Sequence, residues 1–441
     1  YFYFRWLKLI NDKGIFSFIT SNSWLDVDFW ASLQEFLLKF VDNISIYDNS
    51  AERSFANASI NTIIAIFDKP RFYKKDMVYK KLRDLENDFW KTKFINFKKS
   101  FEEVIFSENF REIEDIYKNP VVEKLEEKTI KTWEISFRKK SNDDFRVVYI
   151  DNNSLFIDWS EKEETKLWNF YKYEWNKWWG KYLKAPDIFF TILEKWGEKL
   201  IKLWSIAKLI KRNNLEKFKD WNILNENYKE NWNFPFLHSL KDITWISIIN
   251  DLLPKSFEKT DLNKDCIYIK PDIISNRFIW DRMFFIEWWD FLVNDSFFIC
   301  SLEEWQDKEF ILSFINSTFS LLNIEIIWRK TYWWLWVMYI YWPEFRTVLV
   351  WNYFKLEEKN IYKIKDKIKS IKSREIKSIF EELWFDKNKN IREQEPKPLT
   401  DRKELDDIIF DEIWLTIDER KEVYWSLWEL VKNRSDKAKS K

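Results

Sequence analysis

Apolar and polar positions over residues 1–70 follow helical spacing in some segments and strand spacing in others. Tyr1–Ile10 and Phe29–Phe40 show the spacing of amphipathic helices. Short apolar runs at Ile15–Ile19, Ile44–Tyr47 and Ile60–Phe67 predict strands separated by turns and polar loops. Helix, strand, helix, strand, loop and strand, in this order, predict the closing half of an α/β domain.

The remainder of the chain predicts three further regions. Mixed acidic and basic runs after the first region indicate solvated faces. Short strands, basic loops and a helix at Glu309–Thr318 follow, and isoleucines at helical spacing between Asn360 and Phe380 predict another helix. Two more helices are expected within Ile408–Val431, with Thr416 as an N-cap. The expected organisation is an α/β region at 1–70, a connecting segment at 71–175, an α+β domain at 176–355 and a helical tail at 356–441.

Tryptophan is unusually frequent in this chain, and glycine is unusually rare. The sequence has 29 tryptophans and 3 glycines, whereas average glycine usage of about 7% would give about 31 glycines. In the stretch Trp328–Trp351, the tryptophans at 333, 334, 336 and 342 stand where a tight basic loop needs small residues that allow φ > 0. We therefore hypothesise that many tryptophans are glycines, encoded by UGA in a source organism that reads this codon as glycine. A chain folded with tryptophan at these positions is expected to show several of them exposed, crowded or in turns.

Charge and cysteine content limit the possible chemistry. The chain has 73 basic and 73 acidic residues, so nucleic-acid binding requires local basic patches rather than bulk charge. Two cysteines and a single histidine, His238, give no disulfide framework and no metal cluster, and they exclude most histidine-dependent mechanisms. The sequence has no apolar run of about 18 residues. We expect a cytoplasmic protein without a metal and without a membrane partner.

Two segments of the first region carry a resemblance. L-K-L-I-N-D-K-G-I-F-S-F-I-T-S-N-S-W-L ends at Leu25, and R-S-F-A-N-A-S-I-N-T-I-I-A-I-F ends at Phe67. Both resemble adenine-specific DNA methyltransferases of the TaqI-like and type IIG class, which implies that residues 1–70 close a Rossmann-like methyltransferase sheet. The resemblance implies that Phe55 stacks on the extruded target adenine, because enzymes that modify a base take it out of the helix. The alternative is a core residue that caps the following strand. Trp24 is expected to be a true tryptophan that packs.

The later regions resemble the DNA-specificity domain of the same enzymes. The matching segments are N-K-W-W-G-K-Y-L-K-A-P from Asn176, L-W-S-I-A-K-L-I-K-R from Leu203, N-D-S-F from Asn294 and I-N-S from Ile315. The resemblance implies a target-recognition domain on double-stranded DNA, where arginine and lysine contact phosphates and guanines. The candidate DNA-binding residues are Lys211, Arg212, Arg277, Arg282, Arg329 and Lys330. The alternative for any one of them is a solvated charge.

One departure from the family concerns catalysis. No two prolines are adjacent, so the N/D/S-P-P-Y/F catalytic motif is absent, and no glycine loop for S-adenosyl-L-methionine precedes Gly14. We therefore expect no catalytic and no cofactor-binding residues in this chain, which alone would be inactive. The resemblance implies a site-specific adenine-N6 methyltransferase of a restriction-modification or phage-defence system. Its S-adenosyl-L-methionine would be bound by a missing N-terminal half or by a partner subunit. The alternatives are a non-catalytic DNA-specificity subunit and a fused restriction endonuclease, and the upstream gene distinguishes them.

Overall fold

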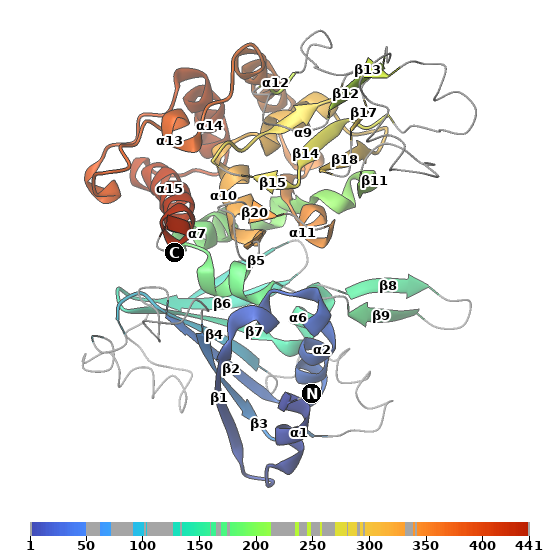
Figure 1. Ribbon diagram of the computed structural model, residues 1–441, viewed down its shortest axis with the longest axis vertical. Helices are drawn as coiled ribbons and strands as arrows, with labels where there is room; N and C mark the ends of the chain where they lie inside the picture. The colour runs from blue at the N-terminus through green and yellow to red at the C-terminus, as the bar shows by residue number, and fades with distance from the viewer. Residues whose placement is uncertain are drawn as a thin grey trace. The chain divides into compact units, whose positions relative to one another are not determined.

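The computed structural model describes residues 2–49, 62–71, 91–100, 103, 127–132, 135–158, 160–164, 169–173, 177–212, 234–237, 245–247, 256–257, 270–279, 281–288, 292–293, 296–330, 338–339 and 342–439. The chain divides into two compact units, Tyr1–Glu198 and Lys199–Lys441 (Figure 1).

A seven-stranded mixed sheet forms the centre of the first unit. In order across the sheet, its strands are β1 (Ile15–Ser21), β3 (Thr62–Asp68), β2 (Asn43–Asn49), β4 (Lys91–Phe97), β7 (Phe145–Asp151), β6 (Ser136–Ser141) and β5 (Glu127–Lys131). β3 runs antiparallel to both of its neighbours, and β2 pairs with β4 in parallel, so β1, β2 and β4 share one direction. The predicted α/β architecture is confirmed, and the range 71–175 contributes β4 to β7 to this sheet.

Helices cover the first unit's sheet. They are α1 (Phe2–Leu9), α2 (Ala31–Phe40), α6 (Asn152–Asp158), α7 (Asp187–Trp196), the 3₁₀ helices η1 (Asn22–Leu25), η2 (Asp28–Trp30) and η4 (Gly197–Lys199), and the π-helix η3 (Trp179–Lys184), beside a hairpin of β8 (Ser160–Glu164) and β9 (Asn169–Tyr173). α1 packs on the sheet through Tyr3, whose ring lies 6.0 Å from Phe16 and 5.8 Å from Phe67. Trp24 is buried between Tyr3 and Trp178, so the prediction that it packs is confirmed.

The second unit contains short strands in four small sheets. The strands are β10 (Leu200–Lys202), β11 (Ala207–Arg212), β12 (Phe234–Leu237), β13 (Ser256–Phe257), β14 (Ile273–Asn276), β15 (Phe278–Ile279), β16 (Phe285–Glu287), β17 (Leu292–Val293), β18 (Phe297–Leu302), β19 (Arg329–Lys330), β20 (Met338–Tyr339) and β21 (Leu349–Trp351). The sheet orders are β11-β18-β14-β16, β15-β20-β19, β13-β12-β17 and β10-β21. Each strand has two to six residues. Most of these sheets join segments that lie far apart in the sequence.

Helices make up most of the rest of the second unit. They are α9 (Lys308–Ile315), α10 (Thr318–Ile327), α11 (Trp342–Arg346), α12 (Glu358–Lys372), α13 (Ile379–Glu382), α14 (Thr400–Glu412), α15 (Ile417–Lys439), η5 (Leu203–Ser205), η8 (Tyr353–Lys355) and η9 (Ile391–Glu393). The predicted isoleucine stripe of α12 is confirmed, because Ile361, Ile364, Ile368 and Ile371 are all buried. Thr416 also caps α15 as predicted, since its hydroxyl accepts a hydrogen bond from the backbone N–H of Glu419.

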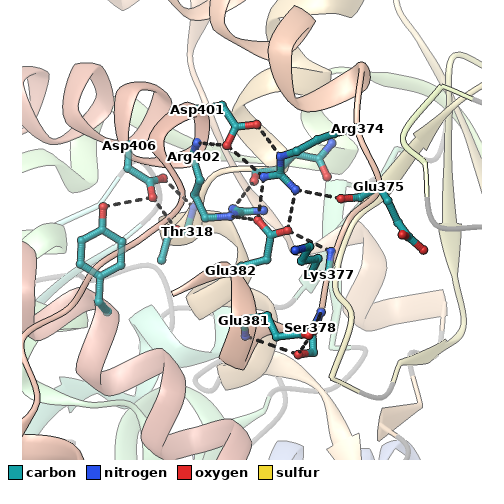
Figure 2. A network of polar contacts seen from close by, with 12 residues as sticks. Thr318, Arg374, Glu375, Lys377, Ser378, Glu381, Glu382, Asp401, Arg402 and Asp406 are labelled. Carbon is teal, nitrogen blue, oxygen red and sulfur yellow. Dashed lines mark hydrogen bonds and ion pairs between the residues drawn. The ribbon is translucent and has the colours of Figure 1, made fainter. Parts of the chain in front are cut away.

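Charged groups in the interior of the second unit are joined in one network (Figure 2). Glu382 on α13 accepts hydrogen bonds from Arg402 at 2.7 Å and from both terminal nitrogens of Arg374. Asp406 accepts hydrogen bonds from Thr318, at the start of α10, and from Tyr424 on α15. Burial raises the pKa of Asp406 to about 6, although Arg402 and these hydrogen bonds act against the rise. The network connects α10, α13, α14 and α15.

Two tryptophans lie at helix ends in a conformation that favours glycine. Trp384 and Trp414 have φ angles of 59° and 56°, and they are the non-glycine residues with positive φ in the described part of the chain. Each follows the C-cap of a helix, and the next N–H bonds back across the turn, from Phe385 to the Phe380 carbonyl and from Leu415 to the Phe410 carbonyl. This is the Schellman arrangement, whose left-handed position is usually glycine. The side chains of Trp384 and Trp414 are 66% and 84% exposed.

The structure describes the tryptophans of the stretch Trp328–Trp351 only in part. Both end residues are buried, and the expectation that several tryptophans of the stretch are exposed, crowded or in turns remains a prediction. Trp333, Trp334 and Trp336 lie outside the described residues. Trp342 begins α11.

Candidate nucleic-acid interface

The sheet β11-β18-β14-β16 positions one end of the candidate group. Across this sheet, Arg212 on β11 and Ser275 on β14 are both register partners of Phe298 on β18. The inner strands β18 and β14 are buried along most of their length, and in their register Ile274 lies opposite Ile299. The end of β11 and the end of β14 therefore lie at the same end of the sheet.

A second, three-stranded sheet continues directly from that end. β14 is followed by Arg277 and then by β15, whose Phe278 pairs with Tyr339 on β20. On the other side of β20, Tyr339 pairs with Arg329, and Met338 pairs with Lys330. Because neighbouring strands lie about 4.8 Å apart, the backbone of Arg329 is about 10 Å from that of Phe278. We call this end of the two sheets, with Arg212, Arg277, Arg329 and Lys330, the basic end.

Arg277 is the inner member of the basic end. It is 7% exposed, and its guanidinium lies 5.4 Å from the ring centroid of Phe298 and 6.0 Å from that of Phe278. Its backbone N–H donates to the carbonyl of Ser296 at 2.9 Å. Arg277 therefore packs against the aromatic residues that join the two sheets, and it places a buried positive charge beneath them.

The remaining candidates take different positions. Lys211 is half-buried on β11, and Arg282 is half-buried between β15 and β16. Phe55, the candidate for stacking on the target base, lies outside the described residues. The structure thus gathers Arg212, Arg277, Arg329 and Lys330, and it places Lys211 and Arg282 on their flanks.

Two further basic residues lie near the start of β11, at the other end of the sheet from the basic end. Lys208 on β11 is exposed. Arg346 on α11 stacks over the ring of Trp204, at 5.6 Å from its centroid, and Trp204 lies in η5 directly before β11. The sequence contained a signal for Lys208, because it lies three residues before Lys211. It contained no signal for the contact between Arg346 and Trp204, which are distant in sequence.

Amide side chains hold the backbone at this end of the second unit. Asn276 accepts a hydrogen bond from the N–H of Phe278 and donates to the carbonyl of the same residue, which shapes the turn between β14 and β15. Asn316, at the end of α9, bonds to both backbone groups of Phe285. Ser317 caps α10 by accepting a hydrogen bond from the Ser320 N–H. Asn316 and Ser317 thus both bond to the backbone near the junction of α9 and α10.

Thiol and metal chemistry gain no support from the described residues. Burial, together with the carboxylate of Asp272, raises the pKa of the Cys300 thiol far above its usual value, so the thiol remains protonated. No group of three or more histidine, cysteine, aspartate or glutamate residues in the described ranges could hold a metal ion.

The first unit carries polar groups where its parallel strands end. Ligands of α/β sheets bind at this edge. Here Asp48, at the end of β2, accepts a hydrogen bond from the indole N–H of Trp179 at 2.8 Å. Asn96, at the end of β4, donates to the carbonyl of Leu183 at 2.8 Å. The π-helix η3 thus engages both groups.

The described loops do not fit S-adenosyl-L-methionine. The turn after β1 is Asn22–Leu25, and the residues after β4 are Lys98, Lys99 and Ser100. Neither segment offers the glycine-rich backbone that a dinucleotide-like cofactor requires at the end of a strand.

Comparisons with known proteins include a distant similarity to a solved structure. No protein-family model and no curated protein matches the chain. The solved structure of the type IIG restriction endonuclease BpuSI aligns with 97% of this chain at 10% sequence identity and a TM-score of 0.39. The alignment covers 48% of the endonuclease, so this chain spans about half of its length.

Within the described ranges, no single helix is both long and apolar enough to cross a membrane, and α9 and α10 reach that length only together, across a bend of 68°.

Proposed function

We propose that this chain carries the DNA target-recognition part and the last catalytic-domain strands of a site-specific adenine-N6 DNA methyltransferase. Such an enzyme belongs to a restriction-modification or phage-defence system. The observation that carries the proposal is the convergence of Arg212, Arg277, Arg329 and Lys330, which are up to 118 residues apart in sequence, at one basic end. The specificity-domain segments noted in the sequence flank these same residues.

Each part of the basic end has a separate role in this proposal. Arg212, Arg329 and Lys330 contact the phosphates and base edges of double-stranded DNA. Arg277 supports them from the interior. Phosphate contacts set the register of the protein on the duplex, whereas contacts to base edges select the sequence. The short strands suit a recognition surface, because their loops can follow a groove while the sheets hold their ends.

Chemistry in this proposal is divided between two parts of the enzyme. The first unit supplies β1, β2 and β3, in which an antiparallel β3 lies between two parallel strands, and this supports the closing half of a Rossmann-like methyltransferase sheet. Phe55 would stack on the extruded adenine. S-adenosyl-L-methionine and the catalytic loop would come from a separate N-terminal half or a partner subunit.

Binding of the whole chain to a fluorescent DNA duplex at several salt concentrations tests the proposal. Replacing Arg212, Arg329 and Lys330 together with alanine should weaken binding about tenfold or more. It should also reduce the slope of log K against log salt by about 2 to 3, since each lost phosphate contact removes about 0.9.

The matched control changes the net charge by the same amount elsewhere. The helical tail, 356–441, has three exposed lysines suited to this control, Lys363, Lys369 and Lys389. Their triple alanine variant should bind DNA nearly as well as the unchanged chain. Equal weakening in both triple variants would show that bulk charge, not the basic end, holds DNA, and the proposal would then fail.

A further inference from the structure

The face of the first unit's sheet that lies away from α1 and α2 becomes exposed toward β1. One row of register partners crosses four strands on this face, from Ile95 through Tyr47 and Ile64 to Ile19. Ile95 is 3% exposed, Tyr47 and Ile64 are half-buried, and Ile19 is 53% exposed. The same side chains that form a core at β4 therefore meet water at β1.

The outer strand β1 has further features of an unfinished sheet. Ile15 on the same face is 64% exposed, and Ile66 of β3 is half-buried beside it. Among the described residues, β3 is the only strand that pairs with β1. Natural proteins normally protect a long edge strand with charges, proline or a bulge. β1 has none of these along its seven residues, Ile15–Ser21.

We infer that the outer edge of β1 and the isoleucines Ile15, Ile19, Ile64 and Ile66 form a docking surface, named here the open surface. Its occupant is the donor-binding half of the methyltransferase, an α/β segment that adds a strand to β1 and lays a helix on the isoleucines. This inference rests on the proposed function for the identity of the partner. It rests on the open surface alone for the partner's shape.

The geometry favours this occupant over a second copy of the chain. Two copies that pair through β1 would extend the sheet and leave the four isoleucines in water. Two copies that stack through the isoleucines would leave the edge of β1 unpaired. A strand followed by a helix covers both at once, and sheets with parallel strands are normally covered by helices on both faces. The apolar face itself calls for the apolar stripe of a helix.

A partner strand beside β1 would also account for the exposure of Phe2 on α1. Phe2 is 50% exposed and its ring lies 5.1 Å from that of Phe18 on β1. A strand added beside β1 would extend the sheet beneath this ring pair. Phe2 is therefore expected to become buried on the opposite face when the partner binds.

The experiment mixes the purified chain with the separately purified polypeptide encoded immediately upstream. Light scattering after size-exclusion chromatography should show a one-to-one complex, and hydrogen exchange of residues 15–21 should slow in it. Ile19→Lys should weaken the complex at least tenfold, and Ile19→Lys with Ile64→Lys should abolish it. Ile417→Lys is the matched control, because Ile417 is 74% exposed in the second unit, and it should leave the affinity unchanged.

Each contrary result has a definite meaning. No complex, or a complex unaffected by the lysine variants, would overturn the inference. A homodimer that Ile19→Lys separates would assign the surface to a second copy and would also overturn it. The thermal midpoint of Ile19→Lys alone should remain within a few degrees of that of the unchanged chain, which separates lost docking from lost folding. A complex that depends on Ile19 but neither binds nor methylates DNA would keep the open surface and reject the proposed function.

Discussion

Isoleucine side chains are buried on α12 in the helical region, α12–α15, and exposed on β1 at the open surface. Isoleucines of α12 are 0–5% exposed, whereas Ile15 and Ile19 on β1 are 64% and 53% exposed. α12 lies against α9 and α14, and these helices remove its stripe from water. The difference teaches that an apolar pattern defines what an element can bury, while its neighbours decide whether it is buried.

Charged residues sharpen this comparison. In the helical region, Arg402 is completely buried, and it donates to Glu382 and to the carbonyl of Asn316. A buried ion is tolerated only where such partners are complete. The buried groups of the helical region are thus covered and paired by other residues of the chain, whereas the isoleucines Ile15 and Ile19 of the open surface are exposed to water. Three sets of substitutions test this contrast.

Glu382→Gln should have the largest effect. Glu382 is 1% exposed and bonds to both Arg374 and Arg402. Removing its charge leaves the buried Arg402 without its ionised partner, which should lower the free energy of unfolding by about 3–5 kcal/mol. Urea unfolding followed by circular dichroism measures the change, since α12–α15 contribute a large share of the helical signal. Glu381→Gln is the control, because Glu381 lies on the surface in a capping box that glutamine can also complete, and it should cost less than about 1 kcal/mol.

The pH dependence of unfolding gives the same prediction a second measurement. Burial opposes ionisation of Glu382, but the positive charges of Arg402 and Arg374 and their hydrogen bonds lower its pKa to about 2. A carboxyl group with a lowered pKa stabilises the fold above its unfolded pKa, about 4.5, and loses this effect as the pH falls toward 2. Glu382→Gln should therefore remove part of the stability loss between pH 4.5 and 2. An unchanged acid profile would contradict the assigned ion pairs.

Ile368→Ala and Ile19→Ala form the next test, with one substitution in each region. Ile368 is completely buried in α12, so its truncation should cost about 2–5 kcal/mol. Ile19 is half exposed on the open surface, and its truncation should change stability by less than about 0.5 kcal/mol. Comparable losses of unfolding free energy in the two variants would show that Ile19 is already part of a hydrophobic core. The two regions would then not differ in the burial of isoleucine.

The sequence was sufficient where a local pattern determines the outcome. The stripe Ile361, Ile364, Ile368 and Ile371 needs only a helix and any neighbour, and Thr416 needs only the N–H groups that follow it. The first strands were also predicted, because apolar runs between turns leave few alternatives. These are features that residues within about four positions of one another decide.

The basic end required information that the sequence does not contain locally. β15, β19 and β20 are two residues long, and no apolar alternation can be read from two residues. Their pairing joins Phe278 to Tyr339 and Tyr339 to Arg329, contacts that depend on how the whole unit folds. The burial of Arg277 depends on Phe298, an aromatic residue whose position follows from the register of β18. A basic residue in a loop pattern does not by itself reveal such a contact.

Trp384→Gly and Trp414→Gly should have a small effect of the opposite sign, because they should stabilise the protein. Each residue holds a left-handed φ at a helix end, which costs a side chain with a Cβ about 1–2 kcal/mol relative to glycine. Each substitution should therefore raise the free energy of unfolding by about 1 kcal/mol, measured by urea unfolding. Trp384→Ala and Trp414→Ala isolate the backbone, because alanine keeps the Cβ and should give no such gain. Trp428→Gly should instead cost at least about 3 kcal/mol, since Trp428 is completely buried between Phe380 and Phe385.

The coding sequence extends this test to the origin of the tryptophans. If UGA is read as glycine in the source organism, codons 384 and 414 should be UGA, whereas codons 24 and 428 should be UGG, because their side chains fill the core. Stabilisation by glycine together with UGA codons would mean that the natural helical region is more stable than the chain with tryptophan. If glycine proves no better than alanine at both positions, the backbone there is not strained and the structural support for recoding disappears. The contrast between a finished helical region and an open sheet would remain, because no residue of the open surface is a tryptophan.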